Sequence, residues 1–478
     1  MRKVSNSLSF PVFAFFVCSL LYPTHGTCER GDRHSAVVPH VDERVELLSI
    51  VFRLAGNSEY NMNTLPAYSA DIERHFAPYR GRPAVQMAHE LAAKNGVGFD
   101  SVMAMAISLS PPPALQPLVP FTPAVPHQRW GTSGAEKFLP LLRDFYRDSK
   151  FAEFFAAHKV MYRVAETRFA TTLSLVDFGW YPRFYGEAPG LTYHLILGMN
   201  NGDGNYGPRL VHEDGSMELF SVIGCWTHDD AGNPTYPPEQ EYLATIIHEF
   251  NHSFVNPAVA EHWKDFPGAE PVFAIVQDTM RRWAYGDAQT MVDESLVRAA
   301  VIVYFQEKGE ESGKNLQRIR EEQQHGFLWM DELVDKLKVY EAQRALYPTF
   351  PSYLPQIGLF YRDLAPRTAT AFAARCAHVV SLEPFPNHAQ DVDASVRLIT
   401  IVVDKRLDSR GYSINYGAEG SEHYPISDKP TYGEGGLQIL LPVQLKPNQT
   451  YSFVLTPLAF HTQDGYPLEN YTVEFKTR

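Results

Sequence analysis

The sequence predicts an α+β protein with two folded parts: a mostly helical domain that contains a small β-sheet, and an all-β sandwich at the C-terminus. Three observations support this prediction. Apolar residues recur at helical spacing from about residue 41 to residue 347, two β-rich runs interrupt this pattern between residues 191 and 223, and alternating apolar and polar residues dominate beyond residue 393. At 478 residues, the chain is also too long for one ordinary hydrophobic core.

The first residues are typical of a secretory signal peptide. Arg2 and Lys3 form a positive region, residues 10–22 form an apolar stretch, and Gly26 offers a small residue for cleavage. The stretch is too short to span a bilayer comfortably, and no later segment approaches about 20 apolar residues. We therefore expect a signal peptide over residues 1–26 and a secreted or periplasmic protein with no transmembrane segment in the mature chain. An uncleaved N-terminal anchor is the alternative.

Composition narrows the class of protein. A hydrophobic content of 45% with 20% charged residues is typical of a folded globular chain, and a net charge of −13 without a basic stripe argues against nucleic-acid binding. Cleavage near Gly26 would leave Cys28, Cys225 and Cys376, so at most one disulfide is expected, and buried inert thiols are favoured over zinc ligands. Lipid anchoring at Cys28 is disfavoured, because no apolar residue stands three positions upstream.

The helical domain is expected over residues 40–380. A proline-rich passage between Ser110 and Pro126 interrupts its regular structure. Apolar and aromatic stripes at this spacing belong to a core far more often than to a ligand pocket. The expected helical segments cover residues 41–95, 138–155, 294–305 and 316–347.

Two β-rich runs precede the most informative motif. They cover residues 191–197 and 218–223, and the turn-forming residues 200–208 separate them. One interpretation is a hairpin with a solvated loop. The other is a small sheet whose edge strand holds an extended peptide by backbone hydrogen bonds.

The C-terminal part, residues 391–478, alternates apolar and polar residues in short runs separated by turn formers. Short strands at this spacing are typical of a small β-sandwich. The clearest of the expected strands cover residues 396–403, 436–441, 451–455 and 471–476.

The segment His248-Glu249-Phe250-Asn251-His252 is an HExxH motif. Residues four apart lie on the same face of a helix, so both imidazoles can bind one metal ion. Two imidazoles and one further ligand leave a position on Zn²⁺ for a water whose pKa falls from about 15.7 towards about 7. Glu249 would act as the general base and pass the proton to a leaving amine. Two ordinary surface histidines are the alternative.

The residues around the motif favour a buried helix. Residues 237–241 combine proline with acidic residues, as at a helix start, and an apolar run over residues 242–247 leads into His248. Asn256 and Pro257 are expected to end the helix after about four turns.

A catalytic zinc site takes a third protein ligand. The metzincin pattern is excluded, because Ala258 and Val255 stand where it has His and Gly. Glu294, on an expected helix, is the favoured ligand, and Asp293 is the fallback. Arg298, one turn beyond, would pair with Glu294 or bind a substrate carboxylate. An ordinary exposed salt bridge between these two residues is the alternative.

Hydrolysis of an amide also needs a donor for the oxyanion. Tyr304 shares a helix face with Glu294, although helix rise places it roughly 15 Å away. Other candidates are His325, Tyr340 and Tyr353.

Several of these segments together resemble a bacterial family of secreted proteins described as a domain of unknown function with presumed zinc-peptidase character. The resemblance covers roughly residues 40–375 and includes Gly326-Phe327-Leu328-Trp329 in its later helical part. The segments that carry it are residues 41–48, 204–208, 248–257 and Glu294 with residues 297–299.

More distantly, HExxH with a downstream helical Glu is similar to the gluzincin arrangement of zincin-like metallopeptidases. This resemblance implies His248, His252 and Glu294 as zinc ligands and Glu249 as the base. Gluzincins often have Asp where Arg298 stands, which leaves open the group that orients the first histidine. The C-terminal part, from residues 448–451 onward, resembles bacterial Ig-like domains.

The sequence thus predicts a secreted zinc-dependent metallopeptidase (a hydrolase) that acts on a peptide or protein substrate through a zinc-activated water, with Glu249 as the general base. One alternative is a zinc amidohydrolase acting on cell-wall or modified peptides. The other is a non-catalytic secreted binding protein that uses its Ig-like domain.

Overall fold

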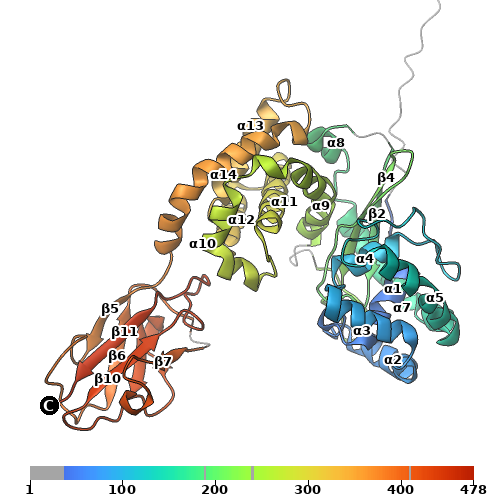
Figure 1. Cartoon of the computed structure of the whole chain (residues 1–478). Helices are drawn as coiled ribbons and strands as arrows, with labels where there is room; N and C mark the ends of the chain where they lie inside the picture. Colours follow the sequence, from blue (N-terminus) through green and yellow to red (C-terminus); the bar gives the residue numbers. More distant parts are fainter. Residues whose placement is uncertain (1–36, 188–189, 238–241, 409–410) are drawn as a thin grey trace, which may run out of the picture. The chain divides into compact units, whose positions relative to one another are not determined.

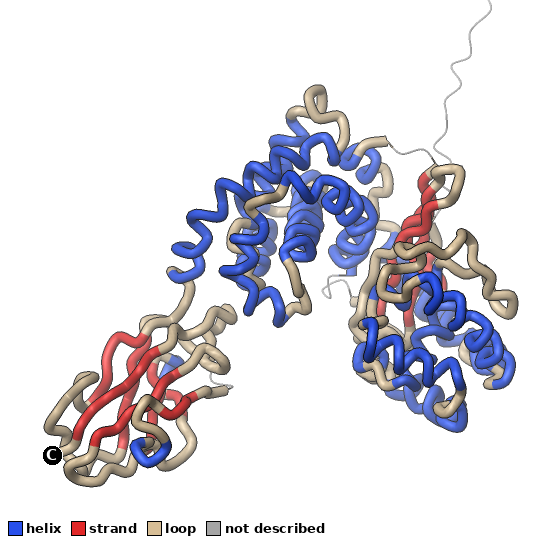
Figure 2. The backbone as a smooth tube through the Cα atoms, in the orientation of Figure 1, coloured by secondary structure: helices blue, strands red, loops and turns tan. Residues whose placement is uncertain are grey.

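The computed structural model describes residues 37–187, 190–237, 242–408 and 411–478 (Figures 1 and 2). They form a mixed α+β structure with small sheets and a strand-rich C-terminal part, as predicted. The expected signal peptide and Cys28 lie outside the described residues. Among the helices in the described part of the chain, none combines the length and apolarity needed to cross a membrane.

The N-terminal helices pack into one large hydrophobic core with the first sheet. Helix α1 is buried along nearly its whole length; Asp42 caps its start by accepting a hydrogen bond from the backbone of Arg44, and Gly56 ends it in the left-handed conformation. The helices of this part are α1 (Glu43–Ala55), α2 (Pro66–Phe76), α3 (Pro83–Asn95), α4 (Asp100–Ile107), α5 (Thr132–Asp148), α6 (Phe151–Ala157), α7 (Lys159–Leu173) and α8 (Trp180–Tyr185).

The first sheet has four strands in the order β1-β2-β4-β3, with bounds Pro39–His40, Leu191–Gly198, Met217–Gly224 and Arg209–Val211 respectively. Strands β2 and β4 are parallel along their full length, from Leu191 beside Met217 to Gly198 beside Gly224. The hairpin interpretation is therefore wrong. The intervening residues cross over to form β3, which pairs antiparallel with β4 and occupies the edge of the sheet.

Helix α9, which carries the HExxH motif, packs against strand β4. It spans Tyr242–His262 and continues through Pro257, whereas the sequence predicted an end there. Proline removes the amide that would bond the carbonyl of Ser253. In the structure, Arg209 Nη1 donates to that carbonyl at 3.3 Å, so the vacated acceptor has a partner and the helix persists.

The second helical group contacts α9 through α11 and α14. It comprises α10 (Ala269–Arg282), α11 (Ala288–Glu307), α12 (Ser312–Gln324), α13 (Met330–Ala342) and α14 (Phe350–Ala373). Helix α11 is capped by Asp287, is buried over most of its length, and packs against α9. The helical segment expected over residues 316–347 divides into α12 and α13, and Gly326, with φ +104°, lies between them.

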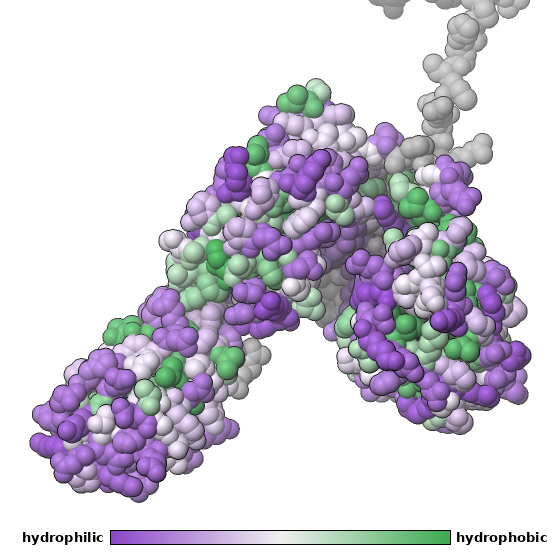
Figure 3. Space-filling view, in the orientation of Figure 1, coloured by the Kyte–Doolittle hydropathy of each residue, from purple (hydrophilic) through white to green (hydrophobic). Residues whose placement is uncertain are grey.

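The C-terminal part consists of two antiparallel sheets around their own hydrophobic core. In Figure 3 its visible surface is largely hydrophilic, as expected when the apolar side chains of alternating strands point inwards. One sheet has the order β5-β6-β9-β8, with bounds Val379–Glu383, Leu398–Val403, Gln438–Pro442 and Thr431–Tyr432. The other has the order β11-β10-β7, with bounds Tyr471–Lys476, Thr450–Leu455 and Ile414–Tyr416. Strand β5 lies upstream of residue 391, the expected start of this part.

Candidate metal centre

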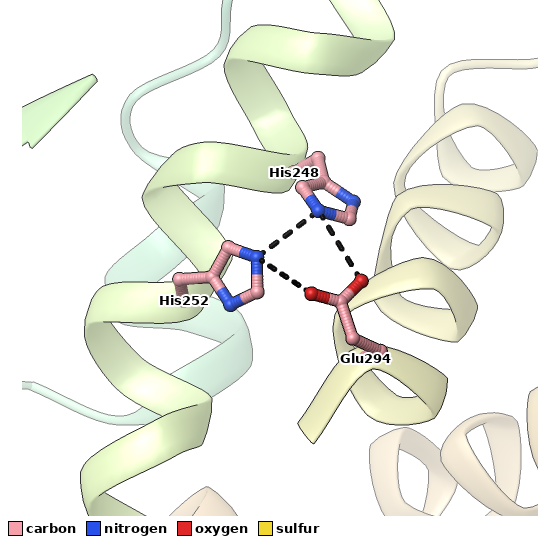
Figure 4. Close-up of side chains that lie close together, drawn as sticks. All are labelled: His248, His252 and Glu294. Carbon is pink, nitrogen blue, oxygen red and sulfur yellow. Dashed lines mark hydrogen bonds and ion pairs between the residues drawn. The ribbon is translucent and has the colours of Figure 1, made fainter. Parts of the chain in front are cut away.

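Helices α9 and α11 bring His248, His252 and Glu294 together (Figure 4). The Nε2 atoms of the two histidines are 3.0 Å apart. Glu294 Oε1 lies 3.5 Å from His252 Nε2, and Oε2 lies 3.7 Å from His248 Nε2. Three donor atoms thus lie around a common point. Two belong to residues one turn apart on α9, and the third belongs to a residue of α11.

These distances fit a tetrahedral zinc ion. With zinc–ligand bonds of about 2.0–2.1 Å, donor atoms at the corners of a tetrahedron lie about 3.3 Å apart, close to the separations observed. Two imidazole nitrogens and one carboxylate are a donor set that zinc accepts, and they leave its fourth position open. The residues present therefore fit zinc.

Surrounding groups prepare the histidines to bind a metal. His252 Nδ1 lies 3.1 Å from Asn256 Oδ1, one turn further along α9, so Nδ1 carries the proton and Nε2 is left as the ligand atom. Burial, followed by the charges of His252 and Arg298, holds the pKa of His248 well below its usual value. The neutral imidazole is the form that binds metal ions.

Glu249 lies beside the three donors and is 6% exposed. Burial, and then the negative charge of Glu294, raise the pKa of its carboxyl well above the usual value. A carboxyl group whose pKa is raised in this way is suited to accept and release a proton during catalysis. Glu249 does not belong to the set of three donors, so it is available for such a role.

Arg298 is occupied by protein groups. Its Nε lies 3.3 Å from Glu294 Oε2, its Nη1 donates to both carboxylate oxygens of Glu322 at 2.9 and 3.1 Å, and its Nη2 donates to the hydroxyl of Tyr285 at 2.7 Å. Of the two predicted roles, the structure thus favours pairing with Glu294 over binding of a substrate carboxylate. Asp293, the fallback ligand, lies outside the group of three donors.

A cavity of about 480 Å³ opens onto this group. Part of its wall is apolar and comes from Ala244, Val301 and Ile302, whereas helix α12 supplies a polar wall. Asn205, in the crossover before β3, also reaches it. The remaining lining residues are Thr245, His248, Glu249, His252, Tyr285, Glu294, Arg298, Arg318, Glu321, Glu322 and His325.

Of the four candidate oxyanion donors, His325 lines the cavity and the three tyrosines do not. Tyr304 does not line the cavity; its hydroxyl accepts from the backbone N–H of Asp177 at 2.9 Å and donates to the carbonyl of Leu175 at 3.4 Å. The prediction of a catalytic Tyr304 is therefore not supported, because three turns of rise along α11 carry it into the core. Tyr340 and Tyr353 are also buried away from the cavity, while His325 lines it.

Three residues that contact His252 or Arg298 were missed by reasoning from the sequence. Asn256 stands one turn after His252, a spacing that would have indicated a contact with that histidine. Its position before proline suggested only a helix end. Tyr285 and Glu322 have no such signal. They reach the site from the α10–α11 connection and from α12 respectively, and only packing between helices brings them to Arg298.

Comparison with known proteins identifies a family. The profile described as "Domain of unknown function (DUF4932)" matches residues 37–358. No curated relative matches the chain.

Matches to solved structures are weak. CopC from Methylosinus trichosporium OB3b is 15% identical, with 21% of this chain and 92% of that chain covered and a TM-score of 0.17. Domains 1–6 of the surface layer protein SbsC are 14% identical, with 49% and 33% covered and a TM-score of 0.17. The N-terminal part of SbsC is 15% identical, with 50% and 64% covered and the same TM-score of 0.17. At this TM-score the matches say nothing about the fold or the function of the chain.

Proposed function

The chain belongs to the DUF4932 family, and we propose that it is a secreted zinc-dependent metallopeptidase with a zincin-like catalytic domain and an Ig-like C-terminal domain. One observation carries this proposal. The donor atoms of His248, His252 and Glu294 are separated by distances that fit the ligands of one zinc ion, and they lie in a cavity that Glu249 also lines. Secretion rests on the expected signal peptide over residues 1–26.

Zinc supplies Lewis acidity to such a site, which makes water more acidic and polarises an amide carbonyl. The protein's own residues perform the proton transfers. Glu249 accepts the proton of the attacking water and passes it to the nitrogen of the leaving amine. Arg298 holds the carboxylate of Glu294 from one side, so that this ligand faces the two histidines.

The crossover before β3 supports a peptide as the substrate. Tyr206 pairs with Val222 of β4, and Gly207 packs so closely on α9 that a Cβ there would overlap the carbonyl of Glu249. Asn205 lines the cavity, and β3 continues from this segment as the edge strand of its sheet. An edge that leads into the cavity suits an extended chain that adds to a sheet by backbone hydrogen bonds.

Two measurements test the proposal. Elemental analysis of the purified protein should give about one zinc per chain. In addition, Glu249→Gln should retain the zinc while cleavage of a peptide library falls below detection, since the substitution removes the base and keeps all three ligands. A metal content far below one equivalent, or cleavage by Glu249→Gln at the wild-type rate, would contradict it. Cleavage confined to cell-wall peptides would favour the amidohydrolase alternative.

A further inference from the structure

Helix α12 supplies the polar wall of the cavity. Arg318, Glu322 and His325 are spaced four and three residues apart, so they share one side of the helix and its C-terminal cap; Glu321 adjoins Glu322, and all four residues line the cavity. The buried residue of this helix is Asn315, so α12 adds little to the hydrophobic core. Its main contribution is a set of polar groups that face the site of the three metal-binding donors.

The ring of His325 is fixed from two sides. Its Nδ1 lies 3.2 Å from Glu322 Oε2, and its plane meets the ring of Trp283 edge-on with centroids 4.5 Å apart. Burial disfavours ionisation of Glu322, but Arg298 and His325 together hold its pKa below the usual value. Because Arg298 also contacts Glu294, a continuous chain of charged contacts runs from the third metal-binding residue to His325.

This contact selects the nitrogen that His325 presents to the cavity. A carboxylate accepts only, so Nδ1 donates to Glu322 and Nε2 is the nitrogen left over. Within the described residues no protein group bonds this Nε2. Other donors on the wall are engaged: Tyr285 contacts both Arg298 and Glu294, and Asn205 Nδ2 donates to the carbonyl of Asp203 at 2.9 Å.

We propose that His325 is a catalytic residue whose Nε2–H donates a hydrogen bond to the carbonyl oxygen of the scissile amide as that oxygen becomes negative. The proposal rests on the hydrolytic function proposed above. In the donating form both ring nitrogens carry a proton, and Glu322 accepts the hydrogen bond from Nδ1. Glu322 is therefore a positioning residue, and its own anchor is Arg298.

Water and the amide are the only reactants that this step needs. The water oxygen bonds to the carbonyl carbon, the π pair moves to the carbonyl oxygen, and Glu249 takes the water proton. The carbon–nitrogen bond then breaks, and the amine leaves with the proton that Glu249 carried. His325 stabilises the negative oxygen between these events and keeps its own proton.

The test uses two inhibitors of zinc-loaded protein, measured by titration calorimetry. The phosphinic peptide Ac-Ala-ψ[PO2CH2]-Ala-NH2 carries a tetrahedral anion, whereas mercaptoacetyl-Ala-NH2 binds zinc through its thiolate and carries none. His325→Gln should weaken phosphinate binding about 10–100-fold, the effect of one hydrogen bond to a charged group, and leave thiol binding unchanged. It should lower kcat about 10²–10³-fold with little change in KM. Glu322→Gln should show a smaller loss with the same selectivity.

His262 provides a matched control. Its Nδ1 lies 3.1 Å from Asp265 Oδ2, three residues away, which reproduces the His325 contact at a position that does not line the cavity. His262→Gln should therefore leave both inhibitors and kcat unchanged.

Three results would overturn the role of His325: no weakening of phosphinate binding, equal weakening of both inhibitors, or a selective loss in Arg318→Gln instead. Absence of phosphinate binding to the wild type would do the same. These outcomes are distinct from failure of the proposed function, which shows as a missing zinc equivalent or as an active Glu249→Gln variant. Zinc binding and Glu249-dependent cleavage with unchanged phosphinate affinity would refute His325 alone.

Discussion

Glu294 and Asp293 are neighbours in α11, but their carboxyl groups have different surroundings. Glu294 faces the two histidines and Arg298. Asp293 is 8% exposed, and burial, then the charge of Glu294, raise its pKa to about 8. The helix turns adjacent side chains by about 100°, so Asp293 does not share the position of Glu294 opposite the histidines.

This difference predicts opposite effects of two matched substitutions. Glu294→Gln should weaken zinc binding by more than about 100-fold, because a neutral amide replaces a charged ligand. Asp293→Asn should leave zinc affinity nearly unchanged. Competition with a fluorescent chelator measures both affinities. Loss of zinc in Asp293→Asn, with retention in Glu294→Gln, would show that the ligand has been assigned to the wrong residue.

Glu46, in α1, gives a prediction about pH. It is fully buried, accepts a hydrogen bond from the hydroxyl of Tyr68 at 2.7 Å, and burial raises its pKa to about 7. The folded protein therefore holds this proton over a pH range in which the unfolded chain has released it. The stability from Glu46 is fully present below about pH 4.5 and is lost as the pH rises through about 7, by at most about 3 kcal/mol.

Glu46→Gln should remove this component of the pH dependence, since the amide stays neutral. The unfolding free energy from urea titration should thus fall less steeply between pH 5 and pH 7 than in the wild type. Glu136→Gln, at an exposed position of α5, serves as the control and should keep the wild-type slope. Equal slopes in all three proteins would contradict the assignment.

At the scale of elements, helix α9 depends on a partner from the sheet. Pro257 cannot supply the amide that the Ser253 carbonyl requires, and Arg209, which begins β3, supplies a donor instead. Asn256 remains helical as a result, and its side chain reaches His252. The contact between a sheet edge and a helix thus helps to orient a metal-binding residue.

A double-mutant cycle tests this dependence. Arg209→Met should destabilise the protein by about 1–2 kcal/mol, because it leaves the Ser253 carbonyl without its donor. In a Pro257→Ala background the restored amide of residue 257 can bond that carbonyl, so Arg209→Met should cost at least about 0.5 kcal/mol less. Urea unfolding of the four proteins gives the coupling energy. Strict additivity would mean that Arg209 does not compensate for the proline.

At the scale of the whole molecule, the proposed zinc ion joins two helices that are distant in sequence. His248 and His252 belong to α9 and Glu294 to α11, and both helices pack within the same hydrophobic core. An ion that binds the folded but not the unfolded chain stabilises the fold, by about 2.7 kcal/mol at a free concentration 100 times its Kd.

Removal of the metal should therefore lower Tm by several degrees in the wild type. Glu249→Gln should show the same drop, because Glu249 is not a ligand, whereas His252→Gln should show little further change on chelation. Thermal unfolding with and without a chelator, followed by zinc addition, measures the effect. A drop of equal size in His252→Gln would indicate that metal acts elsewhere on the chain.

Much of the fold followed from local pattern. The α+β class, most helices, the C-terminal strands and the resemblance to a domain of unknown function are confirmed, because periodicity and turn residues act over short stretches of chain. The hairpin alternative for β2 and β4 and the helix end expected at Pro257 were wrong. The observed pairing and the continued helix depend on partners elsewhere in the chain, namely the crossover through β3 and Arg209.

The sequence by itself determined the part of the candidate site that lies on one helix. The spacing of His248, Glu249 and His252 is set by the turn of an α-helix and needs no other segment. Only the tertiary structure decided what faces them. In it Glu294 lies opposite the histidines, Tyr304 lies in the core, and α12 and His325 line the cavity. These choices depend on how separate helices pack, which is decided by the shape of a shared core.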